Sequence, residues 1–153
     1  MRSFLQKYTP SVARPWVFLT GCCGELSPVF QSSIHDLARL GVLEIPNSPS
    51  EANLLIVGGW INQALSQKLI QDHKQMPKDT KVMAIGTCAI SASLFKELDK
   101  DVYKMDEILP VDIYVPGCPP REETLVKAIY ELLNKKKELK YEDIKMGKVD
   151  EYF

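Results

Sequence analysis

Residues 53–57 read NLLIV, an uninterrupted apolar run that is typical of a strand whose sheet is covered by helices on both faces. Apolar residues recur at helical spacing over the following segment, 61–74, and a second apolar run, KVMAI, occupies 81–85. A strand, a helix and another strand in this order predict a parallel βαβ unit, because parallel strands need a long crossover connection.

The same alternation continues in both directions along the chain, and predicts three further strands and three further helices. The strands are expected at 16–20 (WVFLT), 42–45 (VLEI) and 112–115 (DIYV), and the helices at 30–40, 89–98 and 122–133. Strands that alternate with helices indicate an α/β fold, which we expect to be a single three-layer, doubly wound and mostly parallel sheet.

The composition is that of one globular domain without a membrane span. The chain has 153 residues, of which 45% are hydrophobic, enough to bury a core. Nineteen basic and twenty acidic residues leave a net charge of −1, which does not favour nucleic acid as a partner. The longest apolar stretch, 54–61, is eight residues long, whereas a spanning helix needs roughly 20. The N-terminal segment carries no recognisable export signal, so we expect a reducing compartment without disulfides.

The last twenty residues differ from the rest of the chain. We expect a domain at 1–133 and a charged tail at 134–153, where six lysines and five acidic residues accompany few apolar ones. Such a tail is typical of a solvated terminus, and the alternative is an arm that lies on a partner subunit.

Each of the four cysteines comes shortly after a predicted strand. They are Cys22, Cys23, Cys88 and Cys118. In an open parallel sheet, the connections at the carboxyl ends of the strands gather along one edge, and ligands bind there. We therefore expect the four thiols to converge and to form a metal site.

Three interpretations of the cysteines are open. A structural zinc site is usually built from Cys-x₂₋₄-Cys pairs, which this sequence lacks. An iron–sulfur cubane presents four iron corners, each of which can accept one thiolate from a separate loop. Cysteines that serve only as small buried hydrophobes would be scattered through strands and helices. The placement at the strand ends favours the cubane.

Glycines accompany every cysteine. Gly21 and Gly24 bracket the adjacent pair, and Gly86 and Gly117 stand shortly before the other two. Glycine allows the backbone to approach a bulky inorganic group and to present N–H groups to its sulfurs. Ordinary turn chemistry explains each glycine individually, but their placement around all four cysteines favours a site.

Three motifs together resemble one family: GCCGE at 21–25, GTCA at 86–89 and PVDIYVPGCPPR at 110–121. They resemble the small iron–sulfur subunit, of the 20 kDa type, of respiratory complex I, which is shared with membrane-bound [NiFe] hydrogenases. The resemblance covers about residues 14–133. It implies a flavodoxin-like domain that binds one [4Fe-4S] cluster through the four cysteines.

The resemblance also implies a function and a set of partners. The chain is expected to be an electron-transfer subunit of a membrane-associated, complex I-like oxidoreductase, and not catalytic alone. Electrons would arrive from a ferredoxin-like iron–sulfur subunit and pass to the active site of a larger catalytic subunit. Membrane subunits would hold this chain peripherally on the cytoplasmic side of the cell membrane.

Two branches of the family remain open. The adjacent cysteines and the alanine after Cys88 resemble the quinone-reducing branch, whereas ARPWVF at 13–18 and Asn62-Gln63 resemble the hydrogenase branch. We favour the quinone-reducing type, with an energy-converting membrane-bound hydrogenase or a related divergent complex as the alternative. From another class, a metal-stabilised assembly scaffold without electron transfer is also open.

Other charged residues are weaker candidates. Glu25 is either a proton-coupled carboxylate beside the cluster or a residue that favours a helix start. Arg121 follows CPP and is expected near Cys118, and Arg39 faces either the cluster or a salt-bridge partner. The two histidines, His35 and His73, are too far apart in sequence for a histidine metal site.

Apolar residues near the cysteines predict an interface. We expect Leu26, Val29, Ile90 and Leu94 to form the apolar core of a contact with a partner, because a cluster at an exposed sheet edge must be covered. The chain is accordingly expected to be unstable or prone to aggregation on its own.

Overall fold

The computed structural model describes residues 12–31, 37–42, 45–92 and 95–133. Its four strands form one all-parallel sheet in the order β1-β2-β3-β4. The strands are β1 (Pro15–Leu19), β2 (Leu54–Gly58), β3 (Lys81–Ile85) and β4 (Ile113–Val115). The α/β fold with a parallel sheet that the sequence predicts is confirmed.

Among the described residues, a single bridge extends the sheet beyond β1. Ala13 pairs in parallel with Val42, and its N–H donates to the carbonyl of Gly41 at 2.8 Å. The next residue, Arg14, turns its carbonyl the other way and accepts from Asn53 at 3.2 Å. Val42 therefore lies on the side of β1 away from β2, and the segments take the chain order 2-1-3-4-5 that is typical of flavodoxin-like folds.

The strand expected at 42–45 is wrong in extent. Of its described residues, only Val42 pairs with the sheet, while Ile45 is exposed and unpaired with any strand; residues 43–44 lie outside the described residues.

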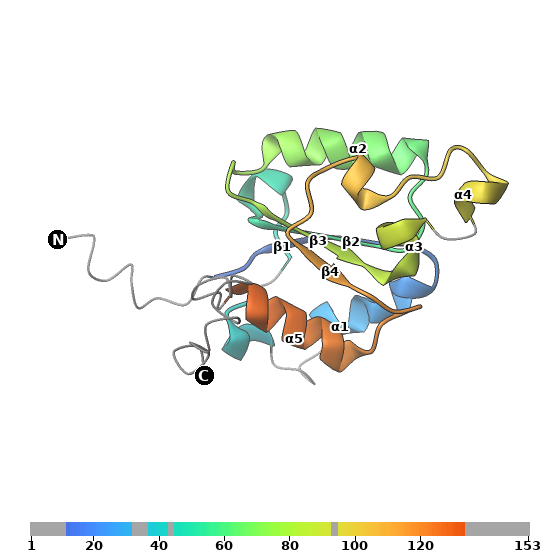
Figure 1. Ribbon diagram of the computed structural model, residues 1–153. Helices are drawn as coiled ribbons and strands as arrows, with labels where there is room; N and C mark the ends of the chain where they lie inside the picture. Colours follow the sequence, from blue (N-terminus) through green and yellow to red (C-terminus); the bar gives the residue numbers. More distant parts are fainter. Residues whose placement is uncertain (1–11, 32–36, 43–44, 93–94, 134–153) are drawn as a thin grey trace, which may run out of the picture.

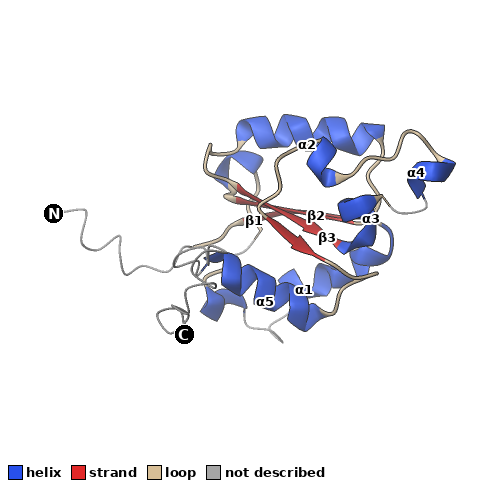
Figure 2. Ribbon diagram, in the orientation of Figure 1, coloured by secondary structure: helices blue, strands red, loops and turns tan. Residues whose placement is uncertain are grey.

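Helices cover both faces of the sheet (Figures 1 and 2). On one face lie α1 (Ser27–Gln31) and α5 (Glu122–Leu133), and on the other lies α2 (Gln63–Gln75). β2 is buried along its whole length because its side chains alternate between the two cores. Leu54 and Ile56 pack with α5, whereas Leu55 and Val57 pack with α2. The three-layer arrangement is thus confirmed.

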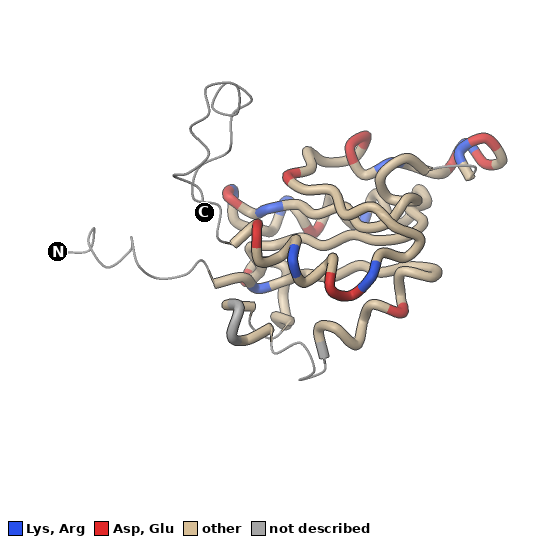
Figure 3. The backbone as a smooth tube through the Cα atoms, turned by 60° about the horizontal axis from the view of Figure 1, so that its bottom comes forward, with Lys and Arg blue, Asp and Glu red and all other residues tan. Residues whose placement is uncertain are grey.

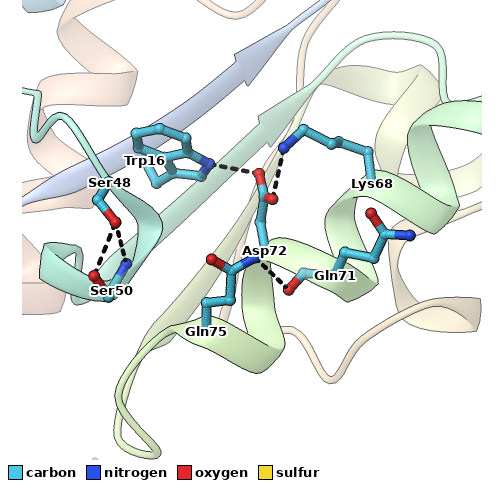
Figure 4. Close-up of polar contacts among 7 residues, drawn as sticks. All are labelled: Trp16, Ser48, Ser50, Lys68, Gln71, Asp72 and Gln75. Carbon is cyan, nitrogen blue, oxygen red and sulfur yellow. Dashed lines mark hydrogen bonds and ion pairs between the residues drawn. The ribbon is translucent and has the colours of Figure 1, made fainter.

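The helix α2, the longest within the described residues, is capped and anchored by polar contacts. Asn62 Oδ1 accepts the N–H of Leu65 at 2.9 Å and begins the helix. Further along, buried Asp72 accepts from Trp16 Nε1 of β1 at 2.9 Å and from Lys68 Nζ at 2.7 Å (Figure 4). These bonds satisfy a carboxylate that would otherwise be costly to bury, and they seat α2 on the sheet.

Two predicted helices are shorter than expected. The helix expected at 89–98 is divided into α3 (Gly86–Ser91) and α4 (Phe95–Leu98), because Ala92 takes a left-handed conformation with φ of 56°. The helix expected at 30–40 is replaced in its described part by the end of α1 and by the 3₁₀ helix η3 (Leu37–Leu40), while residues 32–36 lie outside the described part.

Three further 3₁₀ helices complete the described secondary structure: η2 (Gly21–Leu26), η4 (Pro49–Glu51) and η5 (Met105–Glu107). In Figure 3, basic and acidic residues are interspersed along the described residues, and the full sequence has a net charge of −1. Within the described residues, no helix combines the length and the apolar character that crossing a bilayer requires.

Candidate metal centre

The sheet has a switch point between β1 and β2. After β1 the chain passes through η2 to α1 on one face, whereas after β2 it passes to α2 on the opposite face (Figure 1). Connections that leave adjacent strands toward opposite faces open a crevice at the carboxyl edge, where ligands of such folds bind.

The structure places all four cysteines at this carboxyl edge. Cys22 and Cys23 lie in η2 directly after β1, Cys88 lies in the first turn of α3 after β3, and Cys118 follows β4. Cys23 is buried, Cys88 is partly buried, and the other two are exposed. The site therefore has one thiol anchored in the fold and others that face outward.

A hollow of about 320 Å³ lies at the switch point. Its lining residues are Thr20, Gly21, Cys22, Gly59, Trp60, Cys88, Phe95 and Cys118. Three of the four cysteines thus surround one space, together with the aromatic side chains of Trp60 and Phe95, whose ring centroids are 6.4 Å apart. This volume accommodates a group larger than a single metal ion.

The thiols are near enough to affect one another's ionisation. Burial raises the pKa of Cys23 to about 11, and the charges of Cys22, Cys88 and Cys118 contribute to this increase. Burial also raises the pKa of Cys88, with Cys118 and Cys22 adding to the effect. Burial and the neighbouring thiols thus disfavour the thiolate forms of Cys23 and Cys88, so a metal bound by these thiolates would have to supply a compensating positive charge.

The donors suit an iron–sulfur cluster. Thiolates are soft ligands of the kind that bind such clusters and zinc. Among the described residues, no three His, Cys, Asp or Glu side chains are grouped closely enough to hold one metal ion. A cubane instead accepts one thiolate at each of four corners, so thiols spread around a hollow fit it.

Two glycines are required by the close approach of the backbone at the site. Gly86 has a φ of +81°, and a Cβ there would lie 2.7 Å from Sγ of Cys23. Gly117 has a φ of +149°, and a Cβ there would lie 2.3 Å from Cα of Pro120. Any side chain at either position would displace a cysteine-bearing turn.

The other two glycines expected at the site differ from each other. Gly21 lines the hollow and has a φ of +56°. Gly24 is not among the lining residues, and a Cβ there would meet nothing within 4 Å. The close packing around the cysteines therefore accounts for Gly86 and Gly117 directly, and not for Gly24.

The two charged candidates lie at the surface. Glu25 is exposed in η2, two residues after Cys23. Arg121 is exposed, and its carbonyl accepts the N–H groups of Thr124 and Leu125 at the start of α5. Neither residue is among those that line the hollow.

The interface expected from Leu26 and Val29 is wrong. Both side chains are buried in this chain's own core, at 3% and 1% exposure, where they pack with α5. Ile90 is partly buried against the core on the α2 side, and Leu94 lies outside the described residues. Leu26 at the end of η2 and Val29 in α1 both face this core, so they are not available to a partner.

Of the remaining charged candidates, His73 is not among the residues that line the hollow. His73 is partly buried in the last turn of α2, and the backbone of Arg39 lies in η3. His35 lies outside the described residues.

Three residues of the site were not predicted from the sequence. Trp60 and Phe95 line the hollow, and Thr20 ties the turn after β1 to the turn after β2. Thr20 N–H donates to Gly58 O at 2.9 Å, and its hydroxyl donates to Trp60 O at 2.8 Å. For Trp60 the sequence did contain a signal, because this large aromatic residue directly follows Gly58 and Gly59, where β2 ends.

Comparison with known proteins shows the family. Residues 20–132 match the family described as NADH ubiquinone oxidoreductase, 20 Kd subunit. The chain belongs to this family, and the resemblance inferred from its cysteine motifs is confirmed.

Relatives in this family are components of multi-subunit oxidoreductases. One NADH-quinone oxidoreductase subunit, from Flavobacterium psychrophilum, is 38% identical over 122 residues, which are 77% of this chain and 65% of the relative. One F(420)H(2) dehydrogenase subunit, from Methanosarcina mazei, is 38% identical over 115 residues, which are 75% of this chain and 62% of the relative. The chain therefore spans slightly less than two thirds of the length of these relatives.

Two solved structures are similar in fold. A chain of the membrane-bound sulfane sulfur reductase, an archaeal respiratory membrane complex, matches with a TM-score of 0.72 and 27% identity, over 92% of this chain and 74% of that one. A chain of an NAD⁺-reducing [NiFe]-hydrogenase matches with a TM-score of 0.58 and 20% identity, over 81% of this chain and 92% of that one. The second likeness concerns the fold alone.

Proposed function

We propose that this chain is an electron-transfer subunit of a membrane-associated, complex I-like oxidoreductase, and that Cys22, Cys23, Cys88 and Cys118 hold one [4Fe-4S] cluster. The observation that carries the proposal is the gathering of the four cysteines at the switch point, three of them around one hollow. Membership of the 20 Kd subunit family supports it.

The chain's own residues would hold the cluster and enclose part of it, because Cys23 is buried whereas Cys22 and Cys118 are exposed. When bound, the cluster would supply reversible one-electron redox chemistry. Buried Cys23 fixes one ligand in the core, with its Sγ 4.0 Å from the carbonyl oxygen of Ile85. Trp60 and Phe95 line the hollow with apolar surface. An apolar environment lowers the local polarity and thereby influences the reduction potential of a bound cluster.

Exposed apolar residues at the hollow and in the neighbouring helix α4 support the proposal that a partner covers this face. Trp60 is 43% exposed, Phe95 47% and Leu98 82%, and all three belong to the turn after β2 or to α4. Apolar surface beside a site is typical of a protein interface. This face, in place of Leu26 and Val29, is proposed to meet the large catalytic subunit.

The remaining partners follow from the family. A ferredoxin-like iron–sulfur subunit is proposed to deliver electrons, and membrane subunits to hold the complex on the cytoplasmic side of the cell membrane. The quinone-reducing type is favoured because a relative with 38% identity is an NADH-quinone oxidoreductase subunit. The second candidate is a related divergent complex. It is supported by the similarity in fold to a chain of the sulfane sulfur reductase, which extends over 92% of this chain.

Low-temperature electron paramagnetic resonance of the anaerobically purified complex tests the proposal. Chemical reduction should produce the signal of a reduced [4Fe-4S] centre that disappears reversibly on reoxidation. The signal should be absent when Cys118→Ala replaces the wild-type chain. A complex that assembles with this chain but shows no reducible centre assignable to it would instead support the assembly scaffold.

A further inference from the structure

One backbone carbonyl connects two of the cysteine-bearing turns. Thr87, which directly precedes Cys88, donates both its N–H and its hydroxyl to the carbonyl oxygen of Gly117, at 2.8 and 3.0 Å. Gly117 directly precedes Cys118. A carbonyl oxygen has two lone pairs and can accept both bonds.

These two bonds extend the contact between β3 and β4 past the end of the strands. The strand pairing ends at Ile85 and Val115, so the turns that follow are no longer held by the ladder. Gly86 and Gly117 have no side chain that could join the turns, and neither tolerates one. Among the contacts of the described residues, the Thr87 hydroxyl is a side-chain bond that joins the turn of Cys88 to the turn of Cys118.

The adjacent cysteine pair is held independently of Thr87. The turn before Cys22 is fixed by the hydroxyl of Thr20, which donates to Trp60 O at 2.8 Å. Cys23 is buried against β3 and contacts Ile85. Loss of the Thr87 hydroxyl should therefore loosen Cys118 and leave Cys22 and Cys23 in place.

We propose that the Thr87 hydroxyl is a positioning group that sets Cys118 relative to Cys88, and thereby secures one ligand of the metal site. This inference rests on the proposed function, because it concerns the same four thiols. Thr87 is a positioning residue and not a ligand, since its hydroxyl is engaged with the backbone.

The test uses three variants of the full chain in its complex. Thr87→Val removes the hydroxyl but keeps the shape and the N–H bond, and Thr87→Ser restores the hydroxyl. Thr80→Val is the matched control, because Thr80 also donates its hydroxyl to a carbonyl, that of Pro77 at 2.7 Å, but precedes β3 at the opposite edge of the sheet.

Two readouts are independent of activity. The first is the rate at which a chelator removes iron, together with the three-iron resonance signal that follows loss of one corner of a cubane. The second is hydrogen exchange of the Thr87 amide, which reports separation of the two turns. Thr87→Val should speed that exchange about fivefold, the factor that corresponds to one ordinary hydrogen bond. It should also lose iron faster and accumulate the three-iron signal, whereas Thr87→Ser and Thr80→Val should resemble the wild type.

The inference would be overturned if Thr87→Val showed the amide exchange and the iron retention of the wild type. It would also be overturned if Thr87→Ser did not restore wild-type exchange and iron retention. An equal effect of Thr80→Val would show a general loss of stability and would overturn it too. A wild-type complex without iron would refute the proposed function, and the amide exchange of the same variants would then decide whether Thr87 positions the turn of Cys118.

Discussion

A Cβ atom on Gly86 would lie 2.7 Å from Sγ of Cys23, so the turn after β3 and the cysteine after β1 approach more closely than any other residue at position 86 would permit. Cys23 and Gly86 follow strands that are not neighbours, since β2 lies between β1 and β3. The contact thus crosses the switch point and brings the adjacent cysteine pair toward Cys88.

Gly86→Ala should therefore destabilise the site and the fold. The substitution places a side chain at a φ of +81° and against the sulfur, and such strain costs about 1–3 kcal/mol. Urea unfolding measures the loss. Gly24→Ala is the control beside the same cysteine pair, because its Cβ would meet nothing within 4 Å, and it should change the free energy of unfolding by less than about 0.5 kcal/mol. Equal effects of the two variants would contradict this account of Gly86.

Trp60→Ala should weaken the association with the large catalytic subunit. Trp60 is 43% exposed and packs beside Phe95 at the hollow, and central aromatic residues of interfaces commonly contribute about 2 kcal/mol or more. Binding of the purified partner, measured by titration, should be reduced accordingly. Tyr130→Ala, at a similarly exposed aromatic residue of α5, is the control and should bind normally. Unchanged binding by Trp60→Ala would remove this face as the interface.

Acidification should loosen α4, which carries Phe95. A hydrogen bond from Lys96 of α4 lowers the pKa of Glu107 in η5 from its ordinary value of 4.5, an effect that burial partly opposes. Because the pKa is lower in the folded state, Glu107 contributes stability above pH 4.5, and this contribution is lost as pH falls through the folded value.

The Glu107→Gln variant isolates that contribution. At about pH 7 the variant should be less stable than the wild type by up to about 1 kcal/mol, as for other partly exposed ion pairs. The difference should shrink as the pH falls below 4.5 and vanish once the pH is below the folded-state pKa, where both chains lack the charge. Unfolding curves recorded from neutral pH into acid measure this trend, and a difference that does not shrink in acid would assign the effect to packing instead.

The strands and the last helix could be predicted from sequence because burial dictates their composition. The runs at 53–57 and 81–85 coincide with β2 and β3 to within a residue, and the helix expected at 122–133 is α5. The break at Ala92 could not be predicted, because left-handed residues are usually glycine or asparagine and an alanine carries no such signal.

The site could be predicted in its ligand candidates but not in its surroundings. Parallel strands bring their carboxyl ends together, so the positions of the cysteines in sequence sufficed to place them. The prediction for Leu26 and Val29 was wrong because protein interfaces and protein cores both contain apolar residues. Only the packing of η2 and α1 in the structure shows that these two residues belong to the core. Phe95 reaches the hollow from α4, a placement that depends on tertiary structure alone.

Iron and acid-labile sulfide, measured per chain in the anaerobically purified complex after subtraction of the iron bound by other subunits, test the central claim most directly. The wild-type chain should hold about four of each, and Cys118→Ala should lose at least one iron, because each corner of a cubane requires its own ligand. Stoichiometric zinc without labile sulfide in the wild-type chain would contradict the account.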